Sequence, residues 1–299
     1  MENKLRIAIP KGSLEEGTFS LFKQADLPII RRSNRDYNLL IKDSRISETM
    51  MLRPQEIAGY VEGGEFDLGI TGHDWVVEKK AKVVEVADLR FSKGGWNVVR
   101  IVLATDKNNP IKSIAEIDPN ARVVTEYSSI TRRYFKRIGK EKARIRMSYG
   151  ATEIKVPRLA EYLIDVTETG TTLQANGKKI LDVILESSTR LIANRKSWAN
   201  PKKRQAMEEI KELLLGVIRA KGKVLIKMNI AETKLESLLE YLPALESPTY
   251  SPLFSQNNAE KNFSVETIVE KSQLNIIIPE IRKLGAKGIL EVDVSKVIP

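Results

Sequence analysis

The sequence predicts an α/β protein with mostly parallel sheets, followed by a separate C-terminal module. From Leu5 onward, strand-like segments alternate with helix-like segments, a pattern typical of this class. The last part of the chain instead shows the order βαββαβ, which is typical of ferredoxin-like domains. The formal net charge is +10, yet residues 220–299 hold ten Lys/Arg and ten Asp/Glu, so the whole excess lies in residues 1–219.

The elements of the N-terminal part have local signals. Leu5–Pro10 alternates in polarity and is β-branched, which predicts a strand. Ser13 and Glu16 have capping-box spacing, which predicts a helix that runs to Gln24. Proline suits the first helical position, so Pro54–Glu62 is also predicted to be a helix. Further predicted strands are Tyr37–Asp43, Phe66–Thr71, Arg100–Ala104, Arg122–Thr125 and Tyr162–Ile164, with a short helix at Ile111–Asp118 and another from Leu173 onward.

The C-terminal module is predicted from the same kinds of signal. An amphipathic helix, Lys202–Ala220, is expected to join it to the preceding part. Pro279 is expected to interrupt the second helix of the module. The predicted strands are Lys223–Asn229, Pro248–Phe254, Asn262–Val269 and Gly288–Val294, and the predicted helices are Glu232–Leu242 and Ser272–Leu284.

Composition excludes several classes of protein. Hydrophobic residues make up 42% of the chain and charged residues 29%, values that describe a soluble globular protein. There is no run of about 18 apolar residues and no apolar signal-peptide region after the N-terminal charges, so neither a membrane partner nor secretion is expected. Because the chain has no cysteine, disulfides, thiolate metal sites and cysteine nucleophiles are excluded. A cytoplasmic location fits these features best.

The basic excess is concentrated in one segment. Thr131–Arg146 carries eight basic residues and one acid. Such a cluster can bind nucleic acid or small polyanions, or it can be the solvated face of a helix. Nucleic-acid binding predicts exposed aromatic residues among the basic ones, and aromatic residues are only 6% of this chain. We therefore expect no nucleic-acid partner.

The stretch DVTETGTTLQANG, Asp165–Gly177, carries the clearest chemical signal. Its segment Thr167–Thr172 follows a predicted strand and precedes a predicted helix, where backbone N–H groups and threonine hydroxyls can bind a phosphate. Gly170 permits a positive φ or a close approach of the backbone. The acids Asp165 and Glu168 would repel a phosphate, so they suggest ribose hydroxyls or a magnesium ion between acid and phosphate. An ordinary capped turn is the alternative.

This stretch resembles the 5-phosphoribosyl-1-pyrophosphate (PRPP) loop of phosphoribosyltransferases, and in detail it is similar to the loop of the ATP phosphoribosyltransferase family. Other segments resemble the same family in the same order: Leu5–Leu14, Arg53–Ile57, Asp67–Gly72 and Ser148–Pro157. The C-terminal module resembles the regulatory domain of the family's long form. His73-Asp74-Trp75 and the dense basic cluster lie outside this resemblance.

The resemblance implies a two-lobed, periplasmic-binding-protein-like catalytic core with a ferredoxin-like regulatory domain. Residues 1–99 and 181–219 would form lobe I, residues 100–180 lobe II with the PRPP loop, and residues 220–299 the regulatory domain. Two connections between the lobes would allow hinge closure over PRPP. The same core also serves solute receptors without catalysis, which is the rival interpretation.

The resemblance also implies a reaction and its partners. The family joins the ribose of PRPP to N1 of ATP and releases pyrophosphate, with Mg²⁺ as cofactor. Both substrates are polyanions, which suits a basic excess confined to residues 1–219. Histidine would act as feedback inhibitor at the regulatory domain. A homo-hexamer built from dimers is the expected assembly.

Site residues are carried over position by position. The expected catalytic residues are Lys11, Asp165 and Glu168, and the last two are also the expected metal ligands. The expected PRPP-binding residues are Asp165, Glu168, Thr169, Gly170, Thr171 and Thr172, and the expected nucleotide-binding residues are Arg53, Asp67, Leu68 and Glu153. The effector, histidine, is expected at Thr249 and Ser264. The single histidine of the chain, His73, cannot build a zinc site alone and is expected to be structural or solvent-facing.

Overall fold

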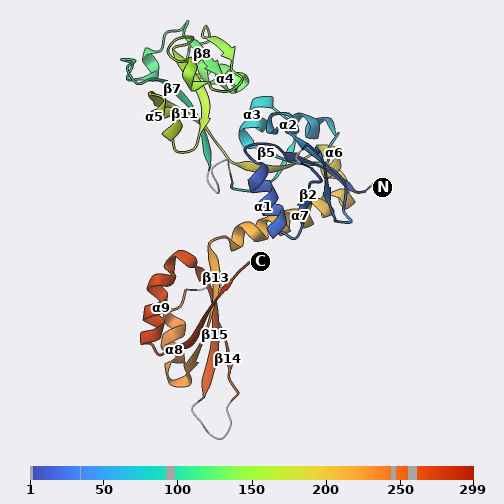
Figure 1. Cartoon of the computed structure of the whole chain (residues 1–299), viewed down its shortest axis with the longest axis vertical. Coiled ribbons are helices and arrows are strands. Elements are labelled where there is room, and N and C mark those ends of the chain that lie inside the picture. Colours follow the sequence, from blue (N-terminus) through green and yellow to red (C-terminus); the bar gives the residue numbers. More distant parts are fainter. Residues whose placement is uncertain (1–2, 34, 92–97, 244–246, 255–260) are drawn as a thin grey trace. The chain divides into compact units, whose positions relative to one another are not determined.

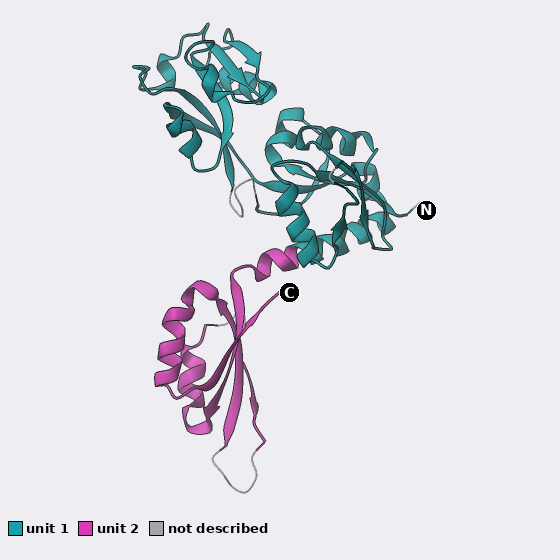
Figure 2. Cartoon of the chain, viewed as in Figure 1, with its two compact units in different colours: residues 1–214 teal, residues 215–299 magenta. Residues whose placement is uncertain are grey.

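The structure is a computed structural model that describes every residue except 1–2, 34, 92–97, 244–246 and 255–260. The chain divides into two compact units, residues 1–214 and residues 215–299 (Figure 2). Each unit has its own sheets and its own buried core. Within the described residues, no helix combines the length and the apolar character needed to cross a bilayer.

The first sheet of unit 1 has seven strands in the order β2-β3-β4-β1-β5-β12-β6. Figure 1 labels β2 and β5 of this sheet and the helices α1, α2, α3 and α6 of the same region. The central strand of the sheet, β1, is parallel to both β4 and β5, whereas β12 is antiparallel to its neighbours. The strands are β1 Leu5–Pro10, β2 Ile29–Ile30, β3 Asn38–Ile41, β4 Ile46–Leu52, β5 Leu68–Gly72, β6 Val84–Asp88 and β12 Thr189–Ala193. The helices around it are α1 Glu15–Gln24, α2 Pro54–Gly63, α3 His73–Lys79 and α6 Arg195–Ala199.

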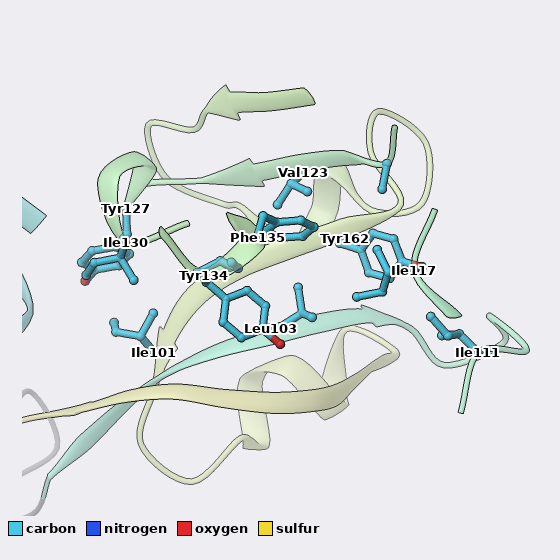
Figure 3. Close-up of a cluster of buried hydrophobic side chains, with 12 residues drawn as sticks. Ile101, Leu103, Ile111, Ile117, Val123, Tyr127, Ile130, Tyr134, Phe135 and Tyr162 are labelled. Carbon is cyan, nitrogen blue, oxygen red and sulfur yellow. The ribbon is translucent and has the colours of Figure 1, made fainter. Parts of the chain in front are cut away.

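The second sheet has five strands in the order β11-β7-β10-β8-β9. Its strands are β7 Val99–Asp106, β8 Arg122–Thr125, β9 Arg144–Met147, β10 Tyr162–Thr167 and β11 Lys178–Ser187, and its helices are α4 Ser128–Arg137 and α5 Thr171–Ala175. A buried cluster packs side chains of α4, such as Tyr134 and Phe135, against strand residues that include Leu103 and Val123 (Figure 3). This cluster gives the second sheet its own core.

The chain passes between the two sheets twice, once from β6 to β7 and once from β11 to β12. This double crossing makes unit 1 a two-lobed α/β core of the periplasmic-binding-protein-like kind. We call the part around the seven-stranded sheet lobe I and the part around the five-stranded sheet lobe II. The lobe boundary predicted after residue 180 falls inside β11, and this strand stays on the five-stranded sheet as far as Ser187.

Two local predictions in unit 1 were wrong. The helix α1 begins at Glu15, and its N-cap, Leu14, makes no side-chain cap, so Ser13 and Glu16 form no capping box. Instead, the Glu15 carboxylate accepts the Gly12 N–H at 3.2 Å. The predicted helix Ile111–Asp118 is only a 3₁₀ turn at Ile114–Glu116, because Pro119 disfavours a helical conformation at the residue before it.

Unit 2 is a ferredoxin-like domain. Its antiparallel sheet has the order β14-β15-β13-β16, as the βαββαβ pattern predicts. The strands are β13 Lys223–Ala231, β14 Thr249–Pro252, β15 Asn262–Glu270 and β16 Lys287–Asp293, and the helices are α8 Glu232–Tyr241 and α9 Leu274–Lys283. Pro279 lies inside α9 without ending it, contrary to the predicted interruption. The long helix α7, Pro201–Ala220, contributes residues to both units.

Candidate active site

A cavity of about 560 Å³ lies between the two lobes of unit 1. Lobe I contributes residues that follow β1 and β5, among them Ser13 and Trp75, and lobe II contributes β10 and the loop after it. Polar side chains from the carboxyl ends of several strands therefore converge here, as expected for ligand sites in α/β sheets. Of the predicted site residues, the cavity brings together Glu153, Asp165, Glu168, Thr169, Thr171 and Thr172.

The loop from Thr167 to Thr172 is held by its own hydrogen bonds. The Thr167 hydroxyl accepts the Gly170 N–H at 3.0 Å, and the Thr169 and Thr171 hydroxyls lie 2.8 Å apart. Gly170 has a φ of +87° and precedes α5. From the neighbouring strand β7, Arg100 Nη2 donates to the Glu168 carbonyl at 3.2 Å. Because α5 has only five residues, its dipole is small, and the threonine hydroxyls supply the side-chain donors of the loop.

Acidic side chains gather beside this loop. Burial, together with the nearby carboxylates of Glu126 and Glu153, raises the pKa of Asp165 to about 6. Asp165 Oδ1 accepts the N–H of Val166 at 2.7 Å. Among the described residues, no three His, Cys, Asp or Glu side chains are placed to hold a metal ion. Carboxylates of this kind fit Mg²⁺ only where substrate oxygens complete its coordination.

Lys11 and Arg53 lie side by side at the carboxyl ends of β1 and β4. These two strands pair in parallel up to Pro10 and Leu52, and the Lys11 N–H donates to the Leu52 carbonyl at 2.7 Å. Neither residue lines the cavity itself, although their neighbours Ser13 and Pro54 do. Lys11 Nζ donates to the Tyr37 hydroxyl at 2.7 Å, and this bond, with the charge of Lys11, lowers the pKa of Tyr37. Tyr37 was missed from sequence because a lone tyrosine just before a short strand carries no signal.

Asp67 and Leu68, which were predicted to bind the nucleotide, lie in the interior of lobe I. Both are fully buried and neither lines the cavity. The Asp67 carboxylate accepts hydrogen bonds from Ser197 Oγ at 2.6 Å and Lys203 Nζ at 2.8 Å, besides Arg6 Nε at 3.2 Å. Burial alone would raise the pKa of Asp67, but these donors hold it below its ordinary value. Asp67 therefore anchors β1, α6 and α7 to one another.

The cavity wall also contains polar residues that the sequence did not reveal. Asp74 and Trp75 stand at the start of α3, after β5, whereas Tyr127 precedes α4 and Ser187 ends β11. Burial raises the pKa of Asp74 and also that of Tyr127. The only sequence signal for a role of these residues in the site was that each lies at or next to the end of a strand. The adjacent His73 is half-buried and its Nδ1 lies 3.2 Å from Glu85 Oε2.

The predicted effector residues lie in unit 2. Thr249 is exposed on β14, and Ser264 is buried on the neighbouring strand β15. Ser264 Oγ has no hydrogen-bond partner among the described residues. The two residues do not face each other directly, since Thr249 pairs with Glu266 and Ser264 pairs with Ser251.

The basic cluster Thr131–Arg146 lies on α4, on β9 and between them, and no residue of it lines the cavity. Most of its charged side chains are exposed. Arg133 Nη2 donates to the Val77 carbonyl at 2.9 Å, and Arg137 lies 5.2 Å from the centre of the Tyr134 ring. The solvated-face interpretation fits this arrangement.

Comparison with known families gives two matches that together cover most of the chain. Residues 53–216 match the family described as HisG, ATP phosphoribosyltransferase. Residues 220–296 match the family described as the HisG C-terminal domain. The first match ends and the second begins near the C-terminal end of α7, close to the division between the two units.

Several curated relatives are similar over their whole length. A protein of Chlorobaculum parvum named ATP phosphoribosyltransferase is 43% identical over 296 residues, which is 99% of this chain and 98% of that protein. A protein of the same name from Desulforudis audaxviator is 43% identical over 298 residues, covering 99% of this chain and 100% of the relative. Among solved structures, a chain of the ATP phosphoribosyl transferase (HisG:HisZ) complex from Thermotoga maritima matches with a TM-score of 0.61 and 29% identity. It covers 72% of this chain and 98% of that chain.

Proposed function

The chain belongs to the ATP phosphoribosyltransferase family, glycosyltransferases of histidine biosynthesis, and from this premise we propose that it joins N1 of ATP to C1 of the PRPP ribose. The N1 lone pair would form the new bond while the electrons of the C1–O bond leave with pyrophosphate, giving phosphoribosyl-ATP. The observation that carries the proposal is the cavity between the lobes, where threonine hydroxyls and carboxylates meet on the wall formed by lobe II.

The loop after β10 is proposed to bind the 5-phosphate of PRPP. Thr169, Thr171 and Thr172 present hydroxyls to the cavity. Gly170 lets the backbone turn between them with a positive φ. Because the hydroxyls already lie close to one another, little conformational entropy would be lost when they bind a phosphate.

Asp165 and Glu168 are proposed to face the ribose hydroxyls and the cation. With a pKa of about 6, Asp165 is ionised at neutral pH and can accept hydrogen bonds from ribose. Its charge would also favour the positive character that develops at C1 as pyrophosphate leaves. Mg²⁺, when bound with PRPP, would neutralise part of the pyrophosphate charge, held by these carboxylates and by substrate oxygens. No strong general base is required, because adenine N1 is itself a competent nucleophile.

The nucleotide and the departing pyrophosphate are proposed to lie toward lobe I. Lys11 and Arg53 bring two cations to adjacent strand ends beside the cavity. Lys11 would neutralise pyrophosphate and Arg53 the ATP phosphates. Glu153, on the cavity wall, remains a proposed contact to the nucleotide. Asp67 and Leu68 are not included, because their side chains are buried away from the cavity.

The activity is tested by incubating the chain with ATP, PRPP and Mg²⁺ and detecting phosphoribosyl-ATP by mass spectrometry. A Lys11→Gln variant should lose at least tenfold in kcat/KM, about the loss of one charge-assisted contact in the transition state. An exposed lysine remote from the cavity, Lys142, provides the matched control as Lys142→Gln. Absence of product from the wild-type chain would refute the proposal.

Regulation and assembly are proposed by analogy with the family's long form. Histidine would bind at unit 2 near Thr249 and Ser264, and the buried hydroxyl of Ser264, which lacks a partner among the described residues, supports this location. Ser264→Ala should weaken histidine inhibition without changing uninhibited kcat. A homo-hexamer built from dimers is proposed, and light scattering would measure its mass. The proposed use of ATP and PRPP favours a cytoplasmic location.

A further inference from the structure

One carboxylate, that of Asp74, connects three parts of unit 1. Its Oδ2 accepts a hydrogen bond from the Tyr127 hydroxyl at 2.9 Å, and its Oδ1 accepts one from Ser187 Oγ at 2.6 Å. The Asp74 N–H donates in turn to Ser187 Oγ at 2.9 Å. Asp74 belongs to lobe I, Tyr127 belongs to lobe II, and Ser187 is the last residue of β11, where the chain returns to lobe I.

Neighbouring contacts strengthen this connection. The Trp75 ring stacks on the Tyr127 ring, with centroids 4.7 Å apart and planes at 28°. We call Asp74, Trp75, Tyr127 and Ser187 the interlobe joint. All four residues line the cavity, so the joint forms part of the cavity wall.

The joint contains a buried, hydrogen-bonded carboxylate, which ordinary packing between the lobes would not need. Asp74, Tyr127 and Ser187 are each at least nine-tenths buried, and burying a carboxylate is unfavourable unless its oxygens are hydrogen-bonded. Two hydroxyls from different parts of the chain satisfy these oxygens only at one relative position of the lobes. Opening of the cavity at this point would leave Asp74 Oδ2 without its donor. The joint therefore defines a preferred spacing of the two cavity walls.

We propose that Asp74 is a positioning residue for the transfer reaction, which acts through Tyr127 and Ser187 to set the distance between the substrate held by lobe I and the substrate held by lobe II. This inference rests on the proposed function. Transfer between two bound substrates depends steeply on their separation, and a misplacement of about 1 Å can cost about a hundredfold in rate. Each substrate, however, would make most of its contacts with its own lobe under the proposed function. Loss of the joint should therefore slow the reaction more than it weakens binding.

The first test compares two tyrosine variants that each remove one hydroxyl donated to an aspartate. Tyr127→Phe breaks the interlobe bond, whereas Tyr134→Phe breaks the bond of Tyr134 to Asp182 at 2.7 Å, which lies wholly within lobe II and away from the cavity. We expect Tyr127→Phe to lower kcat by about ten- to a hundredfold. The dissociation constants of PRPP alone and of ATP alone should change by no more than about twofold, at full binding stoichiometry. Tyr134→Phe should leave kcat within about twofold of the wild-type value.

The second test is rescue at Asp74 itself. In Asp74→Asn, the amide oxygen can still accept from Ser187 and the amide nitrogen can donate to Tyr127, so most of kcat should be retained. Asp74→Ala removes both bonds and should show at least the loss seen for Tyr127→Phe. Binding stoichiometry measured for each variant separates slower reaction from loss of folded protein.

Three results would overturn the inference. Equal kcat for Tyr127→Phe and Tyr134→Phe would show that the interlobe bond has no part in the reaction. A loss confined to substrate affinity, with kcat unchanged, would assign the joint to binding. If the wild-type chain makes no phosphoribosyl-ATP, the proposed function fails and this inference fails with it. If the wild type is active and Tyr127→Phe is equally active, only this inference fails.

Discussion

The hydroxyl oxygens of Thr169 and Thr171 lie 2.8 Å apart, on either side of a glycine whose φ is +87°. A residue with a Cβ pays about 1–2 kcal/mol to adopt this left-handed conformation. A Cβ added at Gly170 would meet only Ile180 Cδ1, at 3.4 Å, so the penalty is conformational rather than steric. The separation of the two hydroxyls therefore depends on the backbone of one residue.

Gly170→Ala should raise the apparent KM for PRPP by about tenfold, which corresponds to about 1.4 kcal/mol of lost binding. The matched control is Gly139→Ala, because Gly139 also has a positive φ, of +71°, and lies outside the cavity with nothing near its missing Cβ. Steady-state kinetics with varied PRPP would measure both variants. Equal KM values for the two would remove the loop from PRPP binding.

Asp165→Asn should stabilise unit 1 at pH 8 while abolishing most activity. Because burial raises the pKa of Asp165 to about 6, the folded state binds its proton more tightly than the unfolded state, and stability falls as pH rises from about 4 to about 6. A shift of about two pKa units corresponds to up to about 3 kcal/mol. The neutral asparagine avoids this penalty.

Urea denaturation followed by tryptophan fluorescence would measure the effect, since Trp75 and Trp198 belong to unit 1 and the sequence of residues 215–299 has no tryptophan. The gain from Asp165→Asn should be largest at pH 8 and mostly lost at about pH 4, where wild-type Asp165 is largely protonated. A variant less stable than the wild type at pH 8 would contradict the assignment of Asp165 as a desolvated carboxylate kept for function.

Asp67→Asn should destabilise unit 1 by about 3 kcal/mol, the low end of the range for breaking a buried ion pair. The low end applies because Arg6 and Lys203 are partly exposed and can turn toward solvent. Since hydrogen bonds hold the pKa of Asp67 below its ordinary value, its stabilisation is present above about pH 4 and is lost as pH falls further. Kinetic constants of the folded fraction should be unchanged, because the residue lies away from the cavity. A raised KM for ATP at wild-type stability would restore the nucleotide-binding role.

The contrast between Asp67 and Thr169 shows what sequence could predict. The proposed PRPP loop has local signals, namely a strand end, a glycine and a run of threonines, and the structure places most of that run on the cavity wall. The role of Asp67 depends on Ser197 and Lys203, more than a hundred residues away, so no local pattern could separate an anchor from a ligand. The resemblance indicated where a signature lies but not which way its side chains point.

The same limit explains the elements that were missed. The βαββαβ order of unit 2 was largely predictable because β13, β15, α8 and α9 each bury a regular face. The helix α4 was only one interpretation of the basic segment and its start was not located, because its N-cap, Tyr127, offers no side-chain cap. Its capping group is Glu78, which comes from another helix, and the sequence cannot show that pairing.

Glu78 caps α4 from the opposite lobe, and its removal should destabilise both the helix and the interlobe contact. Its carboxylate accepts the N–H groups of Ser129 and Ile130 at 2.8 and 2.9 Å. Glu78→Ala should lower the free energy of unfolding of unit 1 by about 1–2 kcal/mol, the cost of losing a cap together with a negative charge at a helix N-terminus. Glu78→Gln should lower the free energy of unfolding by about half as much, because glutamine keeps an acceptor but not the charge.

The control is Glu56→Gln in the first turn of α2, where the glutamate is exposed and the change in the free energy of unfolding should be below about 0.5 kcal/mol. Urea denaturation at low and high salt would measure the variants, and a Glu78→Ala protein as stable as the control would show that α4 needs no cap from lobe I.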